Sequence, residues 1–213
     1  MQLTQIPDEA LPAAIETVRA KLVPGSMARR VFDRIAATRD LIPLGVDTPA
    51  HRQAGIELAH RFGIGTVDEE PQDAWSYDGT NIRTRSEAYV LIHEVGHWLV
   101  AAPARRGMLD FGLGAGPESG RKAEADAQLC VDKEEQIEEE ALASLIGILW
   151  EVELGQPAIL AYLEQNWMEG WDRPACAENL EANLALLLQR GLIDADGRPV
   201  PPESYLRNHS AAA

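Results

Sequence analysis

Apolar residues recur every three or four positions through most of this chain. The pattern covers residues 8–23, 26–39, 49–62, 88–100, 133–154, 158–167 and 175–190, and glycine or proline stops several of these segments, as at Pro24-Gly25 and Gly191. This spacing is typical of helices that bury one face. The sequence therefore predicts a mostly helical protein.

Two short segments have a different pattern. Residues 74–84 carry Asp78-Gly79 between short alternating runs, which predicts a β-hairpin leading into the helix at 88–100. The edge of such a sheet either holds an extended peptide by strand addition or only covers the helix. Residues 41–46 are apolar but contain Pro43, so they are expected to form a connector or an edge strand.

Length and composition predict one domain. The chain has 213 residues, of which 46% are hydrophobic and 25% charged, and these fractions are ordinary for a globular protein. We expect an α+β class with a small hairpin or sheet beside the helix at 88–100. The predicted domain spans residues 1–206, and residues 207–213 are expected to be a disordered tail or a cloning scar.

Charge and cysteine content limit the partners. The net charge of −15 argues against nucleic acid or an anionic membrane as a partner. The apolar run at 141–150 is too short to span a bilayer, and no secretory signal is predicted. Cys130 and Cys176 form no CxxC pair, so reduced thiols in the cytoplasm are expected.

The segment 88–100 contains the candidate chemistry. It reads His93-Glu94-Val95-Gly96-His97, an HExxH pattern in which the two histidines lie one helical turn apart. Neutral imidazoles at this spacing bind a metal ion, and the carboxylate beside the first one accepts a proton from a metal-held water. His93 and His97 are therefore predicted metal ligands, and Glu94 is the predicted general base.

A third ligand is expected from the acidic start of the helix at 133–154. On a helical wheel, Ile137, Ala141 and Leu145 form part of an apolar stripe, and Glu138 and Glu134 lie within or beside it. A carboxylate on a buried face is costly unless it is paired or bound to a metal. Glu138 is the predicted third ligand, with Glu134 as the alternative.

The 103–132 segment is long for a connector. It contains Gly107, Gly112, Gly114, Gly116 and Gly120 and has no clear periodicity. Loops of this length are often lids or walls of a substrate site. We expect this one to have such a role.

Two local resemblances add to this picture. The HExxH motif followed by Glu138-Glu139-Glu140-Ala141, an E-x-x-A segment, resembles the gluzincin branch of zinc metallopeptidases, in particular the small cytoplasmic type that cleaves phage repressors. This resemblance implies a zincin-like fold, with zinc held by His93, His97 and Glu138. It also implies that Glu94 acts as the base on a peptide or protein substrate.

The second resemblance covers residues 86–112. His93-Glu94, His97-Trp98, Ala104-Arg105-Arg106 and Asp110-Phe111-Gly112 follow one another at distances similar to those in bacterial elongation factor P hydroxylase. That resemblance implies Fe²⁺, oxygen activation and hydroxylation of a modified lysine. The two-histidine, one-carboxylate set suits either metal.

Three functions therefore remain open at the level of the sequence. The first is a zinc-dependent, peptidase-like hydrolase, and the second is an iron-dependent hydroxylase. The third is a non-catalytic interaction domain braced by a metal ion, in which Glu94 would have no use as a base.

Overall fold

The computed structural model describes residues 4–209, and most of them are helical. The helices are α1 (Leu11–Lys21), α2 (Met27–Ala37), α3 (Pro49–Arg61), α4 (Ala88–Val100), α5 (Lys122–Asp126), α6 (Lys133–Glu153), α7 (Ala158–Glu164), α8 (Cys176–Gln189) and α9 (Pro202–His209). Two strands, β1 (Gly65–Val67) and β2 (Asn81–Arg83), form a small sheet. The predicted α+β class is confirmed.

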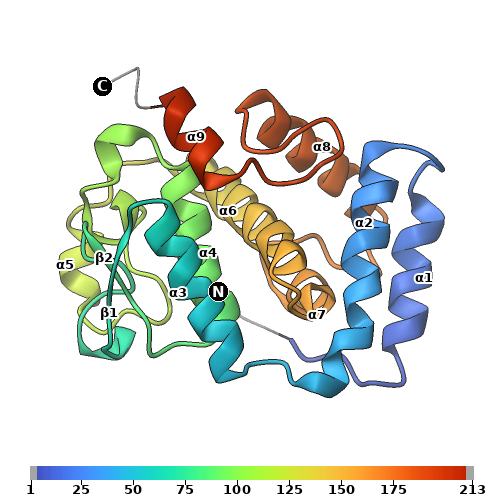
Figure 1. Cartoon of the computed structure of the whole chain (residues 1–213). Helices are drawn as coiled ribbons and strands as arrows, with labels where there is room; N and C mark the ends of the chain where they lie inside the picture. Colours follow the sequence, from blue (N-terminus) through green and yellow to red (C-terminus); the bar gives the residue numbers. More distant parts are fainter. Residues whose placement is uncertain (1–3, 210–213) are drawn as a thin grey trace.

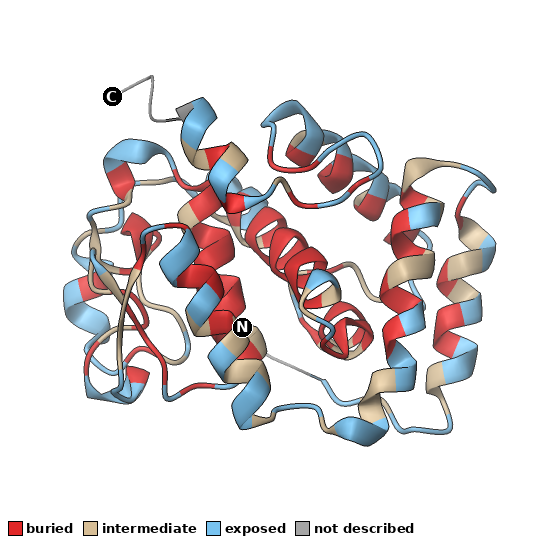
Figure 2. Ribbon diagram, in the orientation of Figure 1, coloured by how far each residue is buried: buried red, intermediate tan, exposed pale blue. Residues whose placement is uncertain are grey.

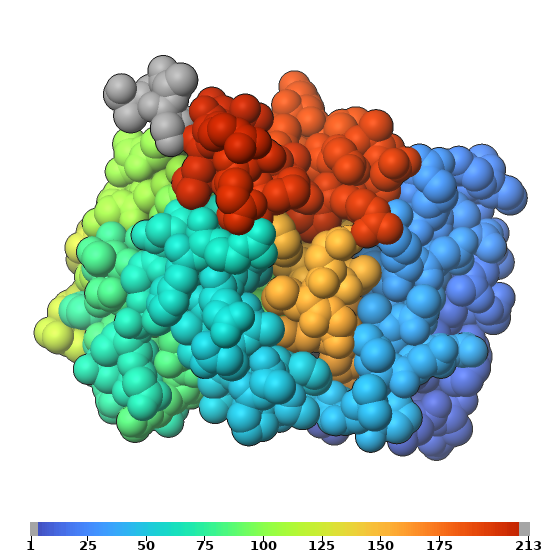
Figure 3. Space-filling model, viewed as in Figure 1, coloured from blue at the N-terminus to red at the C-terminus, as the bar shows by residue number. Residues whose placement is uncertain are grey.

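Helices α4 and α6 form the centre of the molecule. They pack against each other, with α3 on the outer side of α4 and with α7 and α8 against α6 (Figure 1). Both central helices are buried over most of their length, whereas α1 and α9 each expose one side (Figure 2). The chain at the end of α6 and through α7, coloured gold, reaches the surface between α2 and α3 (Figure 3).

Close contact between α4 and α6 depends on glycine. A Cβ atom added to Gly96 would lie 2.3 Å from the carbonyl oxygen of Ala143, so no larger residue fits there without moving a helix. A Cβ atom added to Gly147, further along α6, would lie 3.5 Å from the backbone of His93, an ordinary contact distance. Small residues at both positions therefore bring the backbone of α6 next to the histidines of α4.

The start of α4 is capped from a distant segment. The sequence suggests Ser86 as the cap, but the N-cap residue is Glu87 and neither side chain makes a capping hydrogen bond. Asp47, just before α3, instead accepts a hydrogen bond from the backbone N–H of Ala88 (3.0 Å). One unpaired N–H of the first turn is satisfied in this way, and the start of α4 is fixed to α3.

The sheet differs from the predicted hairpin. The main pairing is parallel, between β1 and β2, with Thr66 opposite Ile82. The turn at Asp78-Gly79 does form, because Asp78 Oδ1 accepts hydrogen bonds from the N–H groups that follow it, but its two arms share only one antiparallel bridge, Tyr77 with Ile82. Two backbone hydrogen bonds also join the arms, from Asp78 N to Asn81 O (3.1 Å) and from Arg83 N to Ser76 O (3.0 Å). The predicted hairpin therefore forms, but it is short and lies beside a parallel pair.

Two further segments were left open by the sequence. Residues 41–46 lie largely in a 3-10 helix, Thr38–Leu44, that joins α2 to α3, so of the two alternatives the connector is the correct one. Of the predicted tail at 207–213, residues 207–209 belong to α9, and residues 210–213 lie outside the described part of the chain, as do residues 1–3. None of the helices within 4–209 has the length and apolar character that a bilayer span requires.

Candidate metal centre

Three side chains from α4 and α6 converge on one point. The Nε2 atoms of His93 and His97 lie 3.0 Å apart, and Glu140 Oε2 lies 3.3 Å from each of them. Both imidazoles are only 4% exposed. Among residues 4–209, this is the one group of histidine, cysteine and acidic side chains whose ligand atoms come close enough to share a metal ion.

We call the three atoms His93 Nε2, His97 Nε2 and Glu140 Oε2 the triangle, and its size suits a metal ion. Ligand atoms about 2.0–2.1 Å from a tetrahedral zinc ion are separated by about 3.3 Å. The separations of 3.0, 3.3 and 3.3 Å are close to that value. Two imidazole nitrogens and one carboxylate oxygen are also ligands that both Zn²⁺ and Fe²⁺ accept.

Glu138, the expected third ligand, does not belong to this group. Its carboxylate is about half exposed and accepts a hydrogen bond from Arg190, at the end of α8. Glu134 is exposed at the start of α6. Because two residues turn a helix by about 200°, Glu138 lies on the side of α6 opposite Glu140. The prediction of Glu138 as ligand is therefore corrected in favour of Glu140.

The error has a physical cause. The wheel takes Ile137 as part of the buried stripe, but that side chain is 48% exposed. From Ala141 to Glu151 the helix is buried on all sides, so apolar residues do not mark the face that contacts α4. Small residues mark it instead: Ser144 and Gly147 follow Glu140 by four and seven positions and lie against His93.

The sequence did contain a signal for Glu140. The E-x-x-A spacing occurs twice within α6, because Glu140-Ala141-Leu142-Ala143 repeats the spacing that begins at Glu138. Only the second copy is followed by a small polar residue, Ser144. The Ser144 hydroxyl lies 3.3 Å from His93 Nδ1, within hydrogen-bond distance, so it contacts the ring on the side away from the triangle.

Glu94 points into the same cavity as the triangle. The cavity has a volume of about 30 Å³, enough for one or two small species such as a water molecule. Glu94 is 8% exposed, and no hydrogen bond to its carboxylate occurs within the described part of the chain. Burial raises its pKa to about 8, so this carboxyl is able to take up and hold a proton near neutral pH.

The triangle has a strongly uneven charge distribution. Burial, together with the neighbouring His97, lowers the pKa of His93 to about 4. Burial also opposes charge on His97, but the carboxylates of Glu140 and Glu139 outweigh it and raise the pKa of His97 to about 10. The pKa of Glu140 is held far below its usual range, because His97 overcomes the effect of burial. One positive charge is thus stabilised at the point where the three side chains meet.

The glycine-rich stretch forms one wall of the cavity. We call residues 107–121 the cover segment. Its residues Asp110 and Phe111 both have positive φ angles, 40° and 56°, a conformation that costs a non-glycine residue roughly 1–2 kcal/mol. Phe111 stacks on Tyr77 at 4.2 Å and on the His97 ring at 5.6 Å between centroids. The strained turn therefore places an aromatic wall beside the histidines.

The cover segment also occupies the sheet edge beside the site. Asp110 Oδ1 accepts a hydrogen bond from Tyr77 N (3.0 Å), and Asp110 N donates one to Tyr77 O (3.0 Å). Ser119 Oγ donates to Asp110 Oδ2 (2.6 Å) and accepts from Ser76 N (3.2 Å). These backbone groups of residues 76 and 77 are therefore not available to an added peptide strand. Strand addition at residues 76 and 77 would therefore require the cover segment to move.

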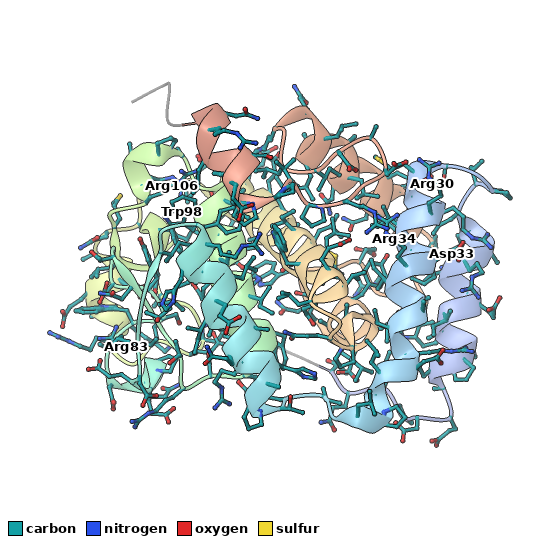
Figure 4. The ribbon with its side chains drawn as sticks, viewed as in Figure 1. Arg30, Asp33, Arg34, Arg83, Trp98 and Arg106 are labelled. Atoms are coloured by element: carbon teal, nitrogen blue, oxygen red, sulfur yellow. The ribbon has the colours of Figure 1, made fainter. Side chains whose placement is uncertain are left out.

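The remaining histidines with described side chains, a buried tyrosine and the arginines after α4 have structural contacts. His51 Nδ1 and His60 Nε2 make hydrogen bonds to Val46 O and Thr66 Oγ1, away from the triangle. Tyr162 is buried against Phe32 in the core. In the Ala104-Arg105-Arg106 segment, Arg106 stacks on Trp98 at 4.2 Å and donates a hydrogen bond to Tyr205 Oη (2.7 Å) (Figure 4).

The chain was compared with protein-family models, curated proteins and solved structures. No family model, no curated protein and no solved structure matches it.

Proposed function

We propose that this protein is a metal-dependent hydrolase of the zinc peptidase type. The observation that carries the proposal is the position of Glu94. Its buried carboxylate shares a small cavity with His93, His97 and Glu140 and forms no hydrogen bond there within residues 4–209. A site that only braces the fold has no need of such a group, because burying a carboxyl without a hydrogen-bond partner is costly.

Each side chain has a distinct part in this proposal. His93, His97 and Glu140 would hold the metal, preferably zinc. When bound, the metal supplies Lewis acidity, which lowers the pKa of a coordinated water toward about 7 and polarises a substrate carbonyl. Glu94 takes the proton from the attacking water and passes it to the departing amine. Burial raises the pKa of Glu94 to about 8, which favours the protonated form that donates to the amine, whereas the positive charge of a bound metal would favour the ionised form that accepts the first proton.

The cover segment limits how a substrate reaches the metal. Ser76 and Tyr77 hydrogen-bond to Ser119 and Asp110, so a peptide cannot pair with this sheet edge unless the segment moves. We propose a peptide or protein substrate that either displaces the segment or inserts one projecting group into the cavity. The free thiols of Cys130 and Cys176 are consistent with a reducing compartment such as the cytoplasm.

An iron-dependent hydroxylase is the second candidate, and the occupied sheet edge favours it. A hydroxylase acts on one projecting side chain and needs no paired peptide strand, which suits a small cavity of about 30 Å³. The ligand set of His93, His97 and Glu140 is also the two-histidine, one-carboxylate arrangement of non-haem iron enzymes. In this reaction Glu94 would be a further ligand or a hydrogen-bond partner of one.

Elemental analysis of protein purified without oxygen tests both candidates. One zinc per chain, with hydrolysis of peptide substrates, supports the first, and iron with substrate-dependent oxygen consumption supports the second. The variant Glu94→Gln should retain the metal but lose turnover, and His93→Ala should lose the metal. A wild-type protein that binds neither ion would rule out both enzymes, and turnover by Glu94→Gln at the wild-type rate would rule out the general base.

A further inference from the structure

A buried ion pair lies directly behind His97. Glu139 follows Glu138 and precedes Glu140 on α6, but it points toward Arg105 rather than into the cavity. Its carboxylate accepts hydrogen bonds from both terminal nitrogens of Arg105, at 3.3 Å from Nη1 and more closely from Nη2. Glu139 is 4% exposed. A charged pair this deep requires a reason, because burying two charges rarely contributes net stability.

The pair also contacts the surroundings of the His97 ring. Arg105 Nη1 donates a hydrogen bond to the carbonyl oxygen of Phe111 (2.7 Å), the residue whose ring stacks on His97. Arg105 therefore connects the carboxylate of Glu139 to the strained turn of the cover segment. One face of the imidazole lies against Phe111, and its Nδ1 edge lies toward Glu139.

The Nδ1 atom of His97 lacks a partner in the described structure. It is buried and makes no hydrogen bond within residues 4–209. Glu139 Oε1 lies 3.9 Å from it, which is about 1 Å too long for a hydrogen bond. A small rotation of the ring or of the carboxylate would close this gap. His93, by contrast, already has Ser144 Oγ beside its Nδ1.

We propose that Glu139, held by Arg105, is the positioning residue for His97. It accepts the Nδ1–H of the ring and thereby keeps the lone pair of Nε2 directed at His93 and Glu140. Histidine ligands commonly donate their second N–H to a carboxylate, which fixes the tautomer and strengthens metal binding. The inference rests on the proposed metal site, because without a metal the orientation of Nε2 has no ligand role.

The competing explanation is that the pair only stabilises the fold. It predicts that metal affinity will follow stability, so that a variant restored to full stability will bind metal normally. If Glu139 positions His97, metal affinity should fall even in a variant whose stability is unchanged. Such a variant is obtainable, because replacing both members of a buried ion pair with apolar residues is often neutral for stability or favourable.

The experiment measures zinc and cobalt affinity by competition with a chelator, alongside thermal unfolding. Glu139→Gln and the double variant Glu139→Leu/Arg105→Met should each bind metal about 10–100-fold more weakly than wild type, the usual effect of losing a carboxylate behind a histidine ligand. Glu139→Asp should recover part of the affinity. Glu135→Gln removes the exposed carboxylate 3.6 Å from the same arginine and should leave affinity unchanged.

The outcomes are distinguishable. A wild-type protein without stoichiometric metal binding contradicts the proposed function itself. Normal metal binding by wild type and by Glu139→Gln contradicts the positioning role alone, and so does normal affinity in the double variant. The visible spectrum of the cobalt form gives a readout independent of turnover, because it reports the geometry at the metal and should change in Glu139→Gln but not in Glu135→Gln.

Discussion

Gly96 of α4 lies against the backbone of Ala143 of α6, with room for no side-chain atom between them. This contact sets the separation of the two helices at the level of the histidines. Glu140 lies one turn before the contact, and its carboxylate reaches the Nε2 atoms of His93 and His97. The glycine inside the HExxH motif is therefore part of the site, although it contributes no side chain.

Gly96→Ala should separate the helices and move Glu140 away from the histidines. We expect a loss of about 1–3 kcal/mol in unfolding free energy, as for other overpacked cores, and weaker metal binding. Gly147→Ala is the matched control, because its Cβ would meet His93 at 3.5 Å, and the gain in helix propensity makes it neutral or stabilising. Denaturant unfolding measures the stability of each variant, and chelator competition measures its metal affinity. Equal effects of the two variants would contradict the role of Gly96.

Glu140→Ala should weaken metal binding far more than Glu138→Ala. Loss of one of three protein ligands should exceed the about 10–100-fold effect of losing a group behind a ligand. Glu138→Ala removes only a half-exposed ion pair with Arg190, which contributes at most about 1 kcal/mol to stability. Metal content after dialysis distinguishes the two variants. Greater metal loss from Glu138→Ala would move the ligand back to the position that the helical wheel suggests.

Ser119→Ala should loosen the cover segment without unfolding the protein. The variant removes a donor to Asp110 and an acceptor for Ser76 N–H, and each lost buried hydrogen bond costs about 1–3 kcal/mol. Hydrogen exchange should quicken at the amides of Ser76 and Tyr77, while those in α1 provide an unchanged reference. Unaltered exchange at residues 76 and 77 would show that the segment is held by other contacts.

Glu151 should make the protein less stable as pH rises. Burial raises its pKa to about 8, so between its ordinary value of 4.5 and 8 the folded state binds more protons than the unfolded state. The linkage relation then requires unfolding free energy to fall across this window. Glu151→Gln should remove that fall, a gain of about 3–4 kcal/mol at pH 8 relative to pH 5.

The measurement for Glu151 is a difference between wild type and variant. Chemical denaturation of both proteins at pH 5, 6, 7 and 8 cancels the titration of other groups that they share. Glu134→Gln, an exposed position on the same helix, is the control and should give no pH-dependent difference. A difference of the same size at every pH would mean that Glu151 is already ionised in the folded protein.

The sequence predicts where the helices begin and end better than it predicts which face of a helix contacts the site. The helix at 88–100 has the predicted bounds, and α6 ends one residue before its predicted end, because apolar periodicity and stop signals define length well. The helical wheel favours Glu138 over Glu140, and this prediction is wrong. The part of α6 that follows Glu140 is buried on all sides, so no apolar stripe shows which face of the helix contacts α4. The parallel pairing of β1 with β2 was missed, since Gly65–Val67 is too short to show a strand pattern.

The cover segment shows a different limit of prediction from sequence. Its glycines indicated a loop near the site, and this is where it lies. That it would occupy the sheet edge could not be predicted, because the result depends on Asp110 and Phe111 adopting a left-handed conformation that their residue types disfavour. Such a conformation persists only where surrounding contacts enforce it, and those contacts come from distant residues such as Tyr77.

The contact between Arg106, Trp98 and Tyr205 has a consequence for biosynthesis. Trp98 follows the second histidine directly, and its ring is covered by Arg106 and by Tyr205 of α9. During translation the histidines emerge well before Tyr205, so one side of the helix that carries them stays uncovered until α9 is made. A chaperone, or a donor of the proposed metal, would have its best access to that helix in this interval.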